Sequence, residues 1–321
     1  MRKPKYLSPT AILLFERDRQ EFYLNYMADH RPPKIPQNRV MSIGAAFDAY
    51  VKTWLSREVS GVEGFEFTQI FEAQVETQNR EWALPHGAYA FSEYQRSGAL
   101  ADLLLELQGS STEPRFELTV ENRVAHERVE GGVPFLGKPD VFYTTKSGRP
   151  TVLDWKVNGY CSDKTTSPKK GYIELYDNGS RKGFHRGSLP ILEEGLYVNR
   201  GFPLETVDAT WATQMSIYSW LLGVAVGDEG LVEIHQLACK GGDREGNREP
   251  SIRVAAHRTV ISAGWQKQLM ARCAEIWSRV CAGEIFDSDN EMMCKKLDDY
   301  YLGYANVDGH VDSDWFNSVS R

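Results

Sequence analysis

Residues 133–157 read VPFLGKPDVFYTTKSGRPTVLDWKV, and this stretch decides the fold. Its two halves, Val133–Thr145 and Thr151–Val157, are rich in β-branched and aromatic residues, and a Ser-Gly turn signal separates them. A third run of this kind, Phe116–Val129, comes before them, and the Gly-Gly pair at 131–132 divides it from the next. The pattern predicts a three-stranded antiparallel meander.

Helical periodicity surrounds this meander on both sides. Residues 1–112 read mainly as helices, and Ser8 followed by Pro9 is a typical helix start. The predicted helices are 9–23, 42–56, 68–82, 90–107, 206–223, 262–282 and 289–302, and two further strands are predicted at 231–240 and 252–260. The order predicts one α/β domain over 1–321. Its parts are a helical N-terminal part (1–112), a core (113–260) with a long insertion (158–205), and a helical C-terminal part with a tail (261–321).

Composition excludes several classes of protein. The 321 residues include 37 aromatic side chains, too many for a disordered chain. Uninterrupted apolar stretches are far shorter than the ~18 residues of a membrane span, so we expect no membrane association. The five cysteines form no CxxC pair, and the N-terminal residues lack the apolar core of a secretory signal. We therefore expect a cytoplasmic protein.

The net charge of −7 hides a basic segment. Residues 156–186 contain seven Lys or Arg against three acids, directly after the last strand of the meander. A local basic patch on an acidic protein can direct a polyanion to one face, although a solvated loop is the alternative. The candidate DNA-binding residues are Lys164, Lys169, Lys170, Arg181, Lys182, His185 and Arg186, with Tyr160, Tyr172, Tyr176 and Phe184 available to stack on bases.

Two carboxylates stand out within the meander. Asp140 falls in the second predicted strand and Asp154 in the third, so a hairpin would bring them together. Paired carboxylates suit Mg²⁺ or Mn²⁺, which prefer oxygen ligands. Lys156 follows Asp154 by two residues, so strand alternation places its ammonium on the same face, beside an attacking water.

The Pro-Asp…Asp-x-Lys pattern formed by Pro139-Asp140 and Asp154-Trp155-Lys156 resembles the PD-(D/E)XK nuclease superfamily, specifically its RecB-like exonuclease branch. The opening Tyr-Leu-Ser-Pro-Thr, the helix motif Gly44-Ala-Ala-Phe-Asp48 and the motif Gln214-Met-Ser-Ile-Tyr218 are similar to further motifs of that branch. The resemblance covers about residues 6–223. It implies a restriction-endonuclease-like core, with a mixed central β-sheet flanked by helices.

The resemblance also implies roles for individual residues. Asp140 and Asp154 would bind one or two Mg²⁺ or Mn²⁺ ions, together with the backbone carbonyl of Trp155, and Lys156 would be the catalytic lysine. Gln214 and Tyr218, one helical turn apart, would line the active site and contact the DNA backbone; core packing is the alternative for Tyr218.

The chain departs from the family pattern in two places. Asp48 stands where the family usually has His, and it is either a metal ligand or a surface acid; Glu121 is the competing third carboxylate. Some relatives hold an iron–sulfur cluster through a Cys in the first helix and a C-terminal Cys group. The first helix here has no Cys, and Cys273, Cys281 and Cys294 are widely spaced, so we expect no cluster.

The sequence thus predicts a metal-dependent deoxyribonuclease of the phage or prophage type, most simply an exonuclease in DNA recombination, repair or end processing. Its partners would be DNA and a recombination or single-strand-annealing protein, in a bacterial cell or phage-infected host. A structure- or sequence-specific endonuclease on the same fold is one alternative. A catalytically silent nucleic-acid-binding protein is the other. Polarity, strand preference and oligomeric state are left open.

Overall fold

The computed structural model of the chain describes residues 1–31, 35–61, 66–161, 196–198, 202–228, 230–243 and 248–284. The helices are α1 (Pro9–Arg17), α2 (Arg19–Phe22), the π-helix η1 (Tyr23–Met27), α3 (Arg39–Ser60), α4 (Phe67–Gln74), the 3₁₀-helix η2 (Thr77–Asn79), α5 (Arg80–Arg96), α6 (Ala99–Gln108), α8 (Leu204–Val207), α9 (Ala209–Leu221) and α10 (Ala263–Ala282). The strands are β1 (Arg115–Phe116), β2 (Val120–His126), β3 (Val129–Gly137), β4 (Val141–Thr144), β5 (Pro150–Asn158), β6 (Leu196–Val198), β7 (Leu231–Lys240) and β8 (Ser251–Val260).

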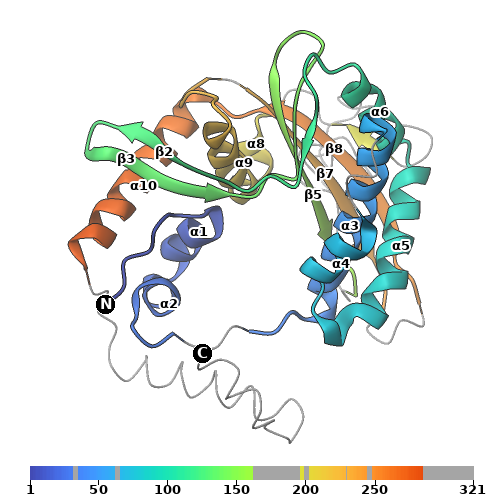
Figure 1. Cartoon of the computed structure of the whole chain (residues 1–321), viewed down its shortest axis with the longest axis horizontal. Helices are drawn as coiled ribbons and strands as arrows, with labels where there is room; N and C mark the ends of the chain where they lie inside the picture. Colours follow the sequence, from blue (N-terminus) through green and yellow to red (C-terminus); the bar gives the residue numbers. More distant parts are fainter. Residues whose placement is uncertain are drawn as a thin grey trace, which may run out of the picture.

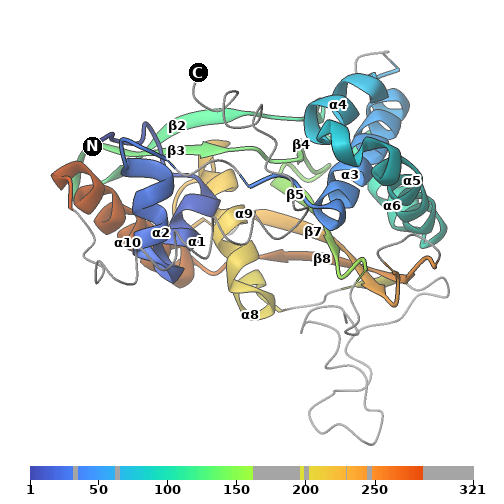
Figure 2. The same ribbon diagram turned by 90° about the horizontal axis from the view of Figure 1, so that it is seen from below.

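A mixed six-stranded sheet is the centre of the α/β fold, with strand order β1-β4-β5-β7-β8-β6. β5 pairs with β7 in parallel, whereas β4 with β5 and β7 with β8 are antiparallel. The helices α3 to α6 gather on one side of this sheet, and α1, α2 and α10 lie with the β2–β3 hairpin on the other (Figure 1). Figure 2 shows the same division from below, with α9 between the two groups.

Helix boundaries follow the capping chemistry of the sequence. The side chain of Ser8 accepts a hydrogen bond from the backbone N–H of Ala11 and starts α1, with Pro9 in the first turn. Asn38 caps α3 in the same way, and α3 ends at Gly61, whose φ of 61° lies in the left-handed region that glycine tolerates. The predicted start of the first helix is therefore confirmed.

The helix α9 is buried on two sides. Met215 packs with Val152 and Ile234 of the central sheet, while Ile217 packs on the opposite side with Phe135 of the hairpin. A helix enclosed in this way is apolar all round, so a polar residue on it has a local reason to be there. Gln214 is such a residue, and it is only partly buried.

The helices α3 and α5 pack unusually closely. Gly87 of α5 lies directly against Ala46 of α3, and a Cβ atom at position 87 would lie 2.5 Å from the Ala46 Cβ and 3.1 Å from the backbone N of Phe47. Only glycine permits this approach. The position of α3 over the sheet therefore depends on a residue without a side chain.

The predicted meander is wrong in one respect. Its second strand is split into β3, which pairs with β2 in a separate hairpin, and β4, which belongs to the central sheet. The break falls at Lys138–Asp140, where Pro139 has no N–H to donate to a ladder. Asp140 thus follows a strand break instead of lying within a strand.

Other boundaries moved as well. The Gly131-Gly132 pair lies inside β3, and the chain reverses at 127–128. The predicted helices 68–82 and 90–107 are redistributed over α4, α5 and α6. The strands at 231–240 and 252–260 and the helix at 262–282 are confirmed, while the helix at 289–302 and residues 162–195 of the insertion lie outside the described residues.

Candidate functional site

Asp140 and Asp154 meet next to the break between β3 and β4. Asp154 lies in the middle of β5 with a side chain that is only 5% exposed. The Oδ2 atom of Asp140 accepts a hydrogen bond of 3.0 Å from the backbone N–H of Trp155. The strand that carries Asp154 therefore also holds Asp140 in place, and the predicted convergence of the two carboxylates is present.

Lys156 and Gln214 complete this group from β5 and α9. The ammonium of Lys156 contacts Oδ2 of Asp154 and donates a 2.9 Å hydrogen bond to Oε1 of Gln214. The amide nitrogen of Gln214 donates to Oδ1 of Asp154 at 3.0 Å and to the hydroxyl of Tyr218 at 2.9 Å. One amide thus links the carboxylate, the ammonium and the phenol.

A second carboxylate group comes from α3 and the segment after β1. Lys52 of α3, with a side chain only 3% exposed, contacts Oδ2 of Asp48 at 2.6 Å, Oδ1 of Asp140 at 2.7 Å and Oε1 of Glu117. The amide of Gln74 donates hydrogen bonds to Oδ2 of Asp48 and Oε1 of Glu117. We call Asp48, Glu117 and Asp140 with Lys52 the lysine-filled cluster.

The excess of acids shifts their protonation. Burial raises the pKa of Asp48 well above its usual value, and the neighbouring Asp140 raises it further against the opposing effect of Lys52. Burial likewise raises the pKa of Asp154, although Lys156 opposes this. For Lys156, burial works to lower the pKa, but Asp154 outweighs it and the pKa is raised. Lys156 is therefore a protonated ammonium at neutral pH.

A cavity of about 300 Å³ lies over both groups. Its lining includes Asp48, Gln74, Lys138, Asp140, Asp154, Trp155, Lys156, Gln214 and Tyr218, and also Gly44, one helical turn before Asp48. The residues that the sequence singled out on four separate segments thus share one cavity.

The donor set has the chemistry that a hard divalent cation requires. Carboxylate oxygens are the ligands that Mg²⁺ and Mn²⁺ prefer, and the buried Oδ2 of Asp154 accepts no hydrogen bond of normal geometry from the described residues. Within those same residues, however, no group of three or more His, Cys, Asp or Glu is arranged to enclose an ion. The ammonium of Lys52 lies where the three carboxylates converge. The carbonyl of Trp155 as a ligand stays a prediction.

Sequence reasoning missed Lys52 and Glu117. Lys52 follows Gly44 and Asp48 at four-residue intervals, so helical spacing alone places all three on one face of α3. Glu117 gave no such signal, because its position depends on a backbone φ of 51°, which is uncommon outside glycine. Glu121, the predicted competitor of Asp48, is exposed on β2 in the separate hairpin and does not line the cavity.

Part of the predicted DNA-binding surface lies outside the described residues. This holds for Lys164, Lys169, Lys170, Arg181, Lys182, His185 and Arg186. Tyr160 is described and is only 2% exposed; its hydroxyl lies 3.1 Å from Nδ1 of His86. The expectation that Tyr160 stacks on bases is therefore wrong, because its ring is packed in the core.

A buried chain of hydrogen bonds lies behind the site, on the opposite face of β5. The indole N–H of Trp155 donates to the hydroxyl of Tyr94 at 3.2 Å, and that hydroxyl lies 2.5 Å from Nδ1 of His235. Nε2 of His235 lies 2.8 Å from Oε1 of Glu233, whose other oxygen accepts from Tyr143 at 2.9 Å. We call these five residues the buried relay.

Donor counting assigns the hydrogens of the buried relay. Because the hydroxyl of Tyr94 accepts from Trp155, its own hydrogen goes to Nδ1 of His235, and Nε2–H of His235 then goes to Glu233. Burial works to raise the pKa of Glu233, but His235 and Arg258 outweigh it and lower the pKa. Each donor of the relay thus meets an acceptor.

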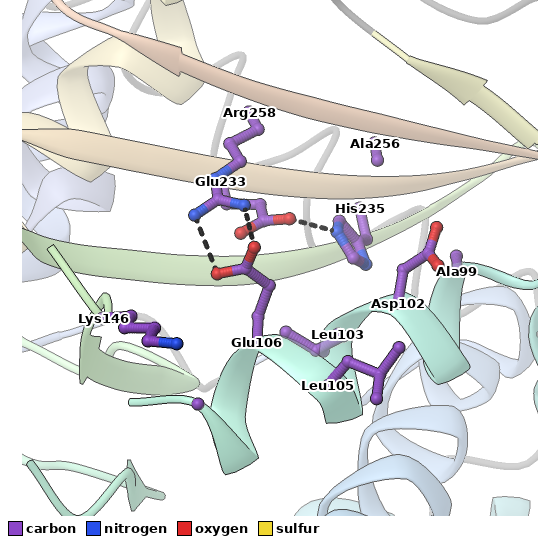
Figure 3. A pocket seen from close by; sticks show the side chains of 11 residues that line it. Ala99, Asp102, Leu103, Leu105, Glu106, Lys146, Glu233, His235, Ala256 and Arg258 are labelled. Carbon is purple, nitrogen blue, oxygen red and sulfur yellow. Dashed lines mark hydrogen bonds and ion pairs between the residues drawn. The ribbon is translucent and has the colours of Figure 1, made fainter. Parts of the chain in front are cut away.

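The Glu233 end of the relay borders a second cavity, of about 450 Å³, between α6 and the sheet. Figure 3 shows Arg258 of β8 paired with Glu106 of α6, and Glu233 hydrogen-bonded to His235 beside this pair. Asp102 and Lys146 lie at its rim. The charged groups at its centre are paired with one another.

No family model and no curated protein matches this chain. Among solved structures, the crystal structure of SSO0001 is similar over 76% of this chain and 79% of that chain, at 10% identity and a TM-score of 0.24. A likeness at that TM-score carries no argument about fold or function. In the described part of the chain, no helix is long and apolar enough to cross a membrane.

Proposed function

We propose that this chain is a Mg²⁺- or Mn²⁺-dependent deoxyribonuclease, most simply an exonuclease of the PD-(D/E)XK type. The observation that carries the proposal is the group formed by Asp140, Asp154, Lys156 and Gln214, which line one cavity. Asp154, Lys156 and Gln214 are in direct contact, and Asp140 accepts a hydrogen bond from the backbone N–H of Trp155, which lies between Asp154 and Lys156. Buried charges are costly and are usually retained for function. The order β4-β5-β7-β8, with β5 parallel to β7, supports a restriction-endonuclease-like core.

Each side chain would have a distinct task. Asp140 and Asp154, with Asp48 on their flank, would hold the ion; a divalent cation bound there would polarise the phosphodiester and lower the pKa of a water molecule. Lys156, held protonated by Asp154, would offset the charge that develops on the phosphorus oxygens. Gln214 would hold the ammonium of Lys156 and the carboxylate of Asp154 in position, and Tyr218 would contact the DNA strand.

A digestion assay tests the proposal. End-labelled linear DNA and a closed single-stranded circle would be incubated with Mg²⁺, Mn²⁺ or EDTA, with the wild type beside Lys156→Ala. Lys146→Ala, at an exposed turn, is the matched control. We expect metal-dependent loss of the linear substrate, abolished by Lys156→Ala and unchanged by Lys146→Ala. Cleavage of the circle would instead indicate an endonuclease.

A second candidate function is DNA binding without cleavage. The observation that favours it is the lysine-filled cluster, in which the ammonium of Lys52 already contacts three of the four carboxylates. DNA binding without cleavage under any metal would support this candidate and contradict the nuclease.

The proposed setting is recombination, repair or end processing in the cytoplasm of a bacterial or phage-infected cell. DNA would be the substrate, and a recombination or single-strand-annealing protein would be the partner. Pull-down of such a protein by the full chain, with and without DNA, would test that partnership.

A further inference from the structure

Lys52 is the most enclosed charge in the candidate site. Its side chain is 3% exposed, and its ammonium contacts three carboxylates that belong to α3, to the segment after β1 and to the segment before β4. Lysine is almost never fully buried unless it is paired. One carboxylate would balance the charge of the ammonium, but three carboxylates contact it.

The charge on Lys52 is a permanent feature of the site. Burial alone would lower the pKa of Lys52, but Asp140, Asp48 and Glu117 outweigh it and raise the pKa well above its usual value. The three ion pairs therefore favour the charged form of Lys52.

The backbone conformation of Glu117 also indicates that its contact with Lys52 is built into the fold. Its φ of 51° is uncommon for a residue other than glycine, and such backbone strain persists only where the surroundings enforce it. Here the strained conformation directs the carboxylate to Lys52 and Gln74. The unusual backbone conformation of Glu117 thus places a third carboxylate against the ammonium of Lys52.

We propose that the ammonium of Lys52 occupies the cation position between Asp48, Glu117 and Asp140, so that a divalent ion which takes Asp48 and Asp140 as ligands must displace it. The inference rests on the proposed function, because it concerns the metal of that same site. The N–O distances of 2.6 and 2.7 Å to Asp48 and Asp140 are those of an ammonium. A Mg²⁺ ion needs about 2.0–2.1 Å. Two cations cannot share these oxygens without strong repulsion, so they compete.

Metal binding by the full-length chain tests this competition. Mn²⁺ would be titrated into metal-free wild type, Lys52→Met and Lys146→Met, and the bound ion would be counted by electron paramagnetic resonance. Lys146 is the matched control because it is an exposed lysine that does not line this cavity. We expect Lys52→Met to lower the Kd for Mn²⁺ at least tenfold and Lys146→Met to leave it within about twofold.

Thermal unfolding provides an independent readout. The neutral methionine leaves three neighbouring carboxylates without a cation, so Mn²⁺ should raise the Tm of Lys52→Met by more than it raises that of the wild type. If Lys52→Met does not fold, the double variant Lys52→Met/Glu117→Gln removes one charge of each sign. We expect it to bind Mn²⁺ more tightly than the wild type, through Asp48 and Asp140.

Equal Mn²⁺ affinity in the wild type and in the folded Lys52 variant would overturn the inference, and so would the absence of Mn²⁺ binding in both. The nuclease proposal fails separately. If Lys52→Met gains affinity while no form of the protein cleaves DNA, the inference stands and the function is wrong. If the wild type cleaves DNA and affinity is unchanged, the reverse holds.

Discussion

Two polar groups lie back to back on β5 and differ in how their charges are balanced. On the face toward α9, the candidate site places four carboxylates against the two ammonium groups of Lys52 and Lys156. On the opposite face, the buried relay contains one carboxylate, and each of its donors meets an acceptor. The relay has the properties of a structural network, whereas the site holds uncompensated charge, as a site that binds a cation should.

Removing the imidazole of the relay should have the largest effect. His235→Leu leaves Oε1 of Glu233 without its donor and the hydroxyl of Tyr94 without its acceptor, and both groups are buried. We expect the free energy of unfolding to fall by about 3–5 kcal/mol. Urea denaturation would measure the loss.

Two companion variants sharpen that result. His30→Leu, at an exposed position, should change the free energy of unfolding by less than about 0.5 kcal/mol. The double variant Glu233→Met/His235→Leu should be more stable than His235→Leu, because it removes both partners. A change below about 1 kcal/mol in His235→Leu would show that water reaches the relay.

Breaking the site should affect activity more than stability. Gln214→Met removes the amide that links Asp154, Lys156 and Tyr218 and keeps the length of the side chain. We expect Mn²⁺-dependent cleavage of DNA to fall about 100-fold, or about 2.7 kcal/mol, with little change in the free energy of unfolding. Initial rates and urea denaturation would be measured together. Gln108→Met, at an exposed position, is the control, and a loss in Gln214→Met below threefold would contradict the assigned role.

A milder substitution tests whether the buried relay affects the candidate site. Tyr94→Phe leaves the indole N–H of Trp155 and Nδ1 of His235 unpaired but keeps the ring. We expect the free energy of unfolding to fall by about 2 kcal/mol and cleavage per folded molecule to stay within about threefold. A loss of activity as large as that of Gln214→Met would show that the relay positions the site through Trp155.

A second buried histidine, His257 of β8, makes the stability of the protein depend on pH. Burial lowers its pKa to about 3 in the folded protein, against about 6.5 when unfolded. The unfolded chain therefore binds a proton between these values that the folded chain does not, so stability is lost as the pH falls below about 6.5.

Replacing this histidine should flatten the pH dependence. From pH 6 to pH 4, we expect His257→Phe to reduce the slope of the free energy of unfolding by up to about 1.4 kcal/mol per pH unit. Urea denaturation at several pH values measures the slope, whatever the absolute stability of the variant. Parallel slopes would mean that His257 becomes protonated in the folded state.

Strand and helix positions were largely predictable because they depend on local pattern. The alternation in β5 placed Asp154 and Lys156 together, and helical spacing paired Gln214 with Tyr218; the structure brings all four into contact. The split of the meander was not predictable in the same way. It depends on whether β3 joins the central sheet or the separate hairpin, and β3 packs against α9 and α10, which lie far away in the chain.

The remaining parts of the site depend on tertiary arrangement. Glu117 reaches the cluster only because its backbone adopts a positive φ, and no local sequence pattern predicts that conformation. Lys52 follows Asp48 by four residues, so the sequence places both on one face of α3. The spacing does not show whether that face contacts solvent, the apolar core or other carboxylates. Asp48 was left undecided for the same reason, and the structure places it beside Lys52.

The glycine at position 87 sets a dimension of the site without touching it. A methyl group there would fall short of a normal carbon contact with Ala46 by about 1 Å, so α3 would have to move. Asp48 and Lys52 lie on that same helix, and an ammonium and a magnesium ion differ in their distance to oxygen by only about 0.6 Å. In the proposed metal site, discrimination between cations by size would therefore depend on the absence of a side chain at position 87 of α5.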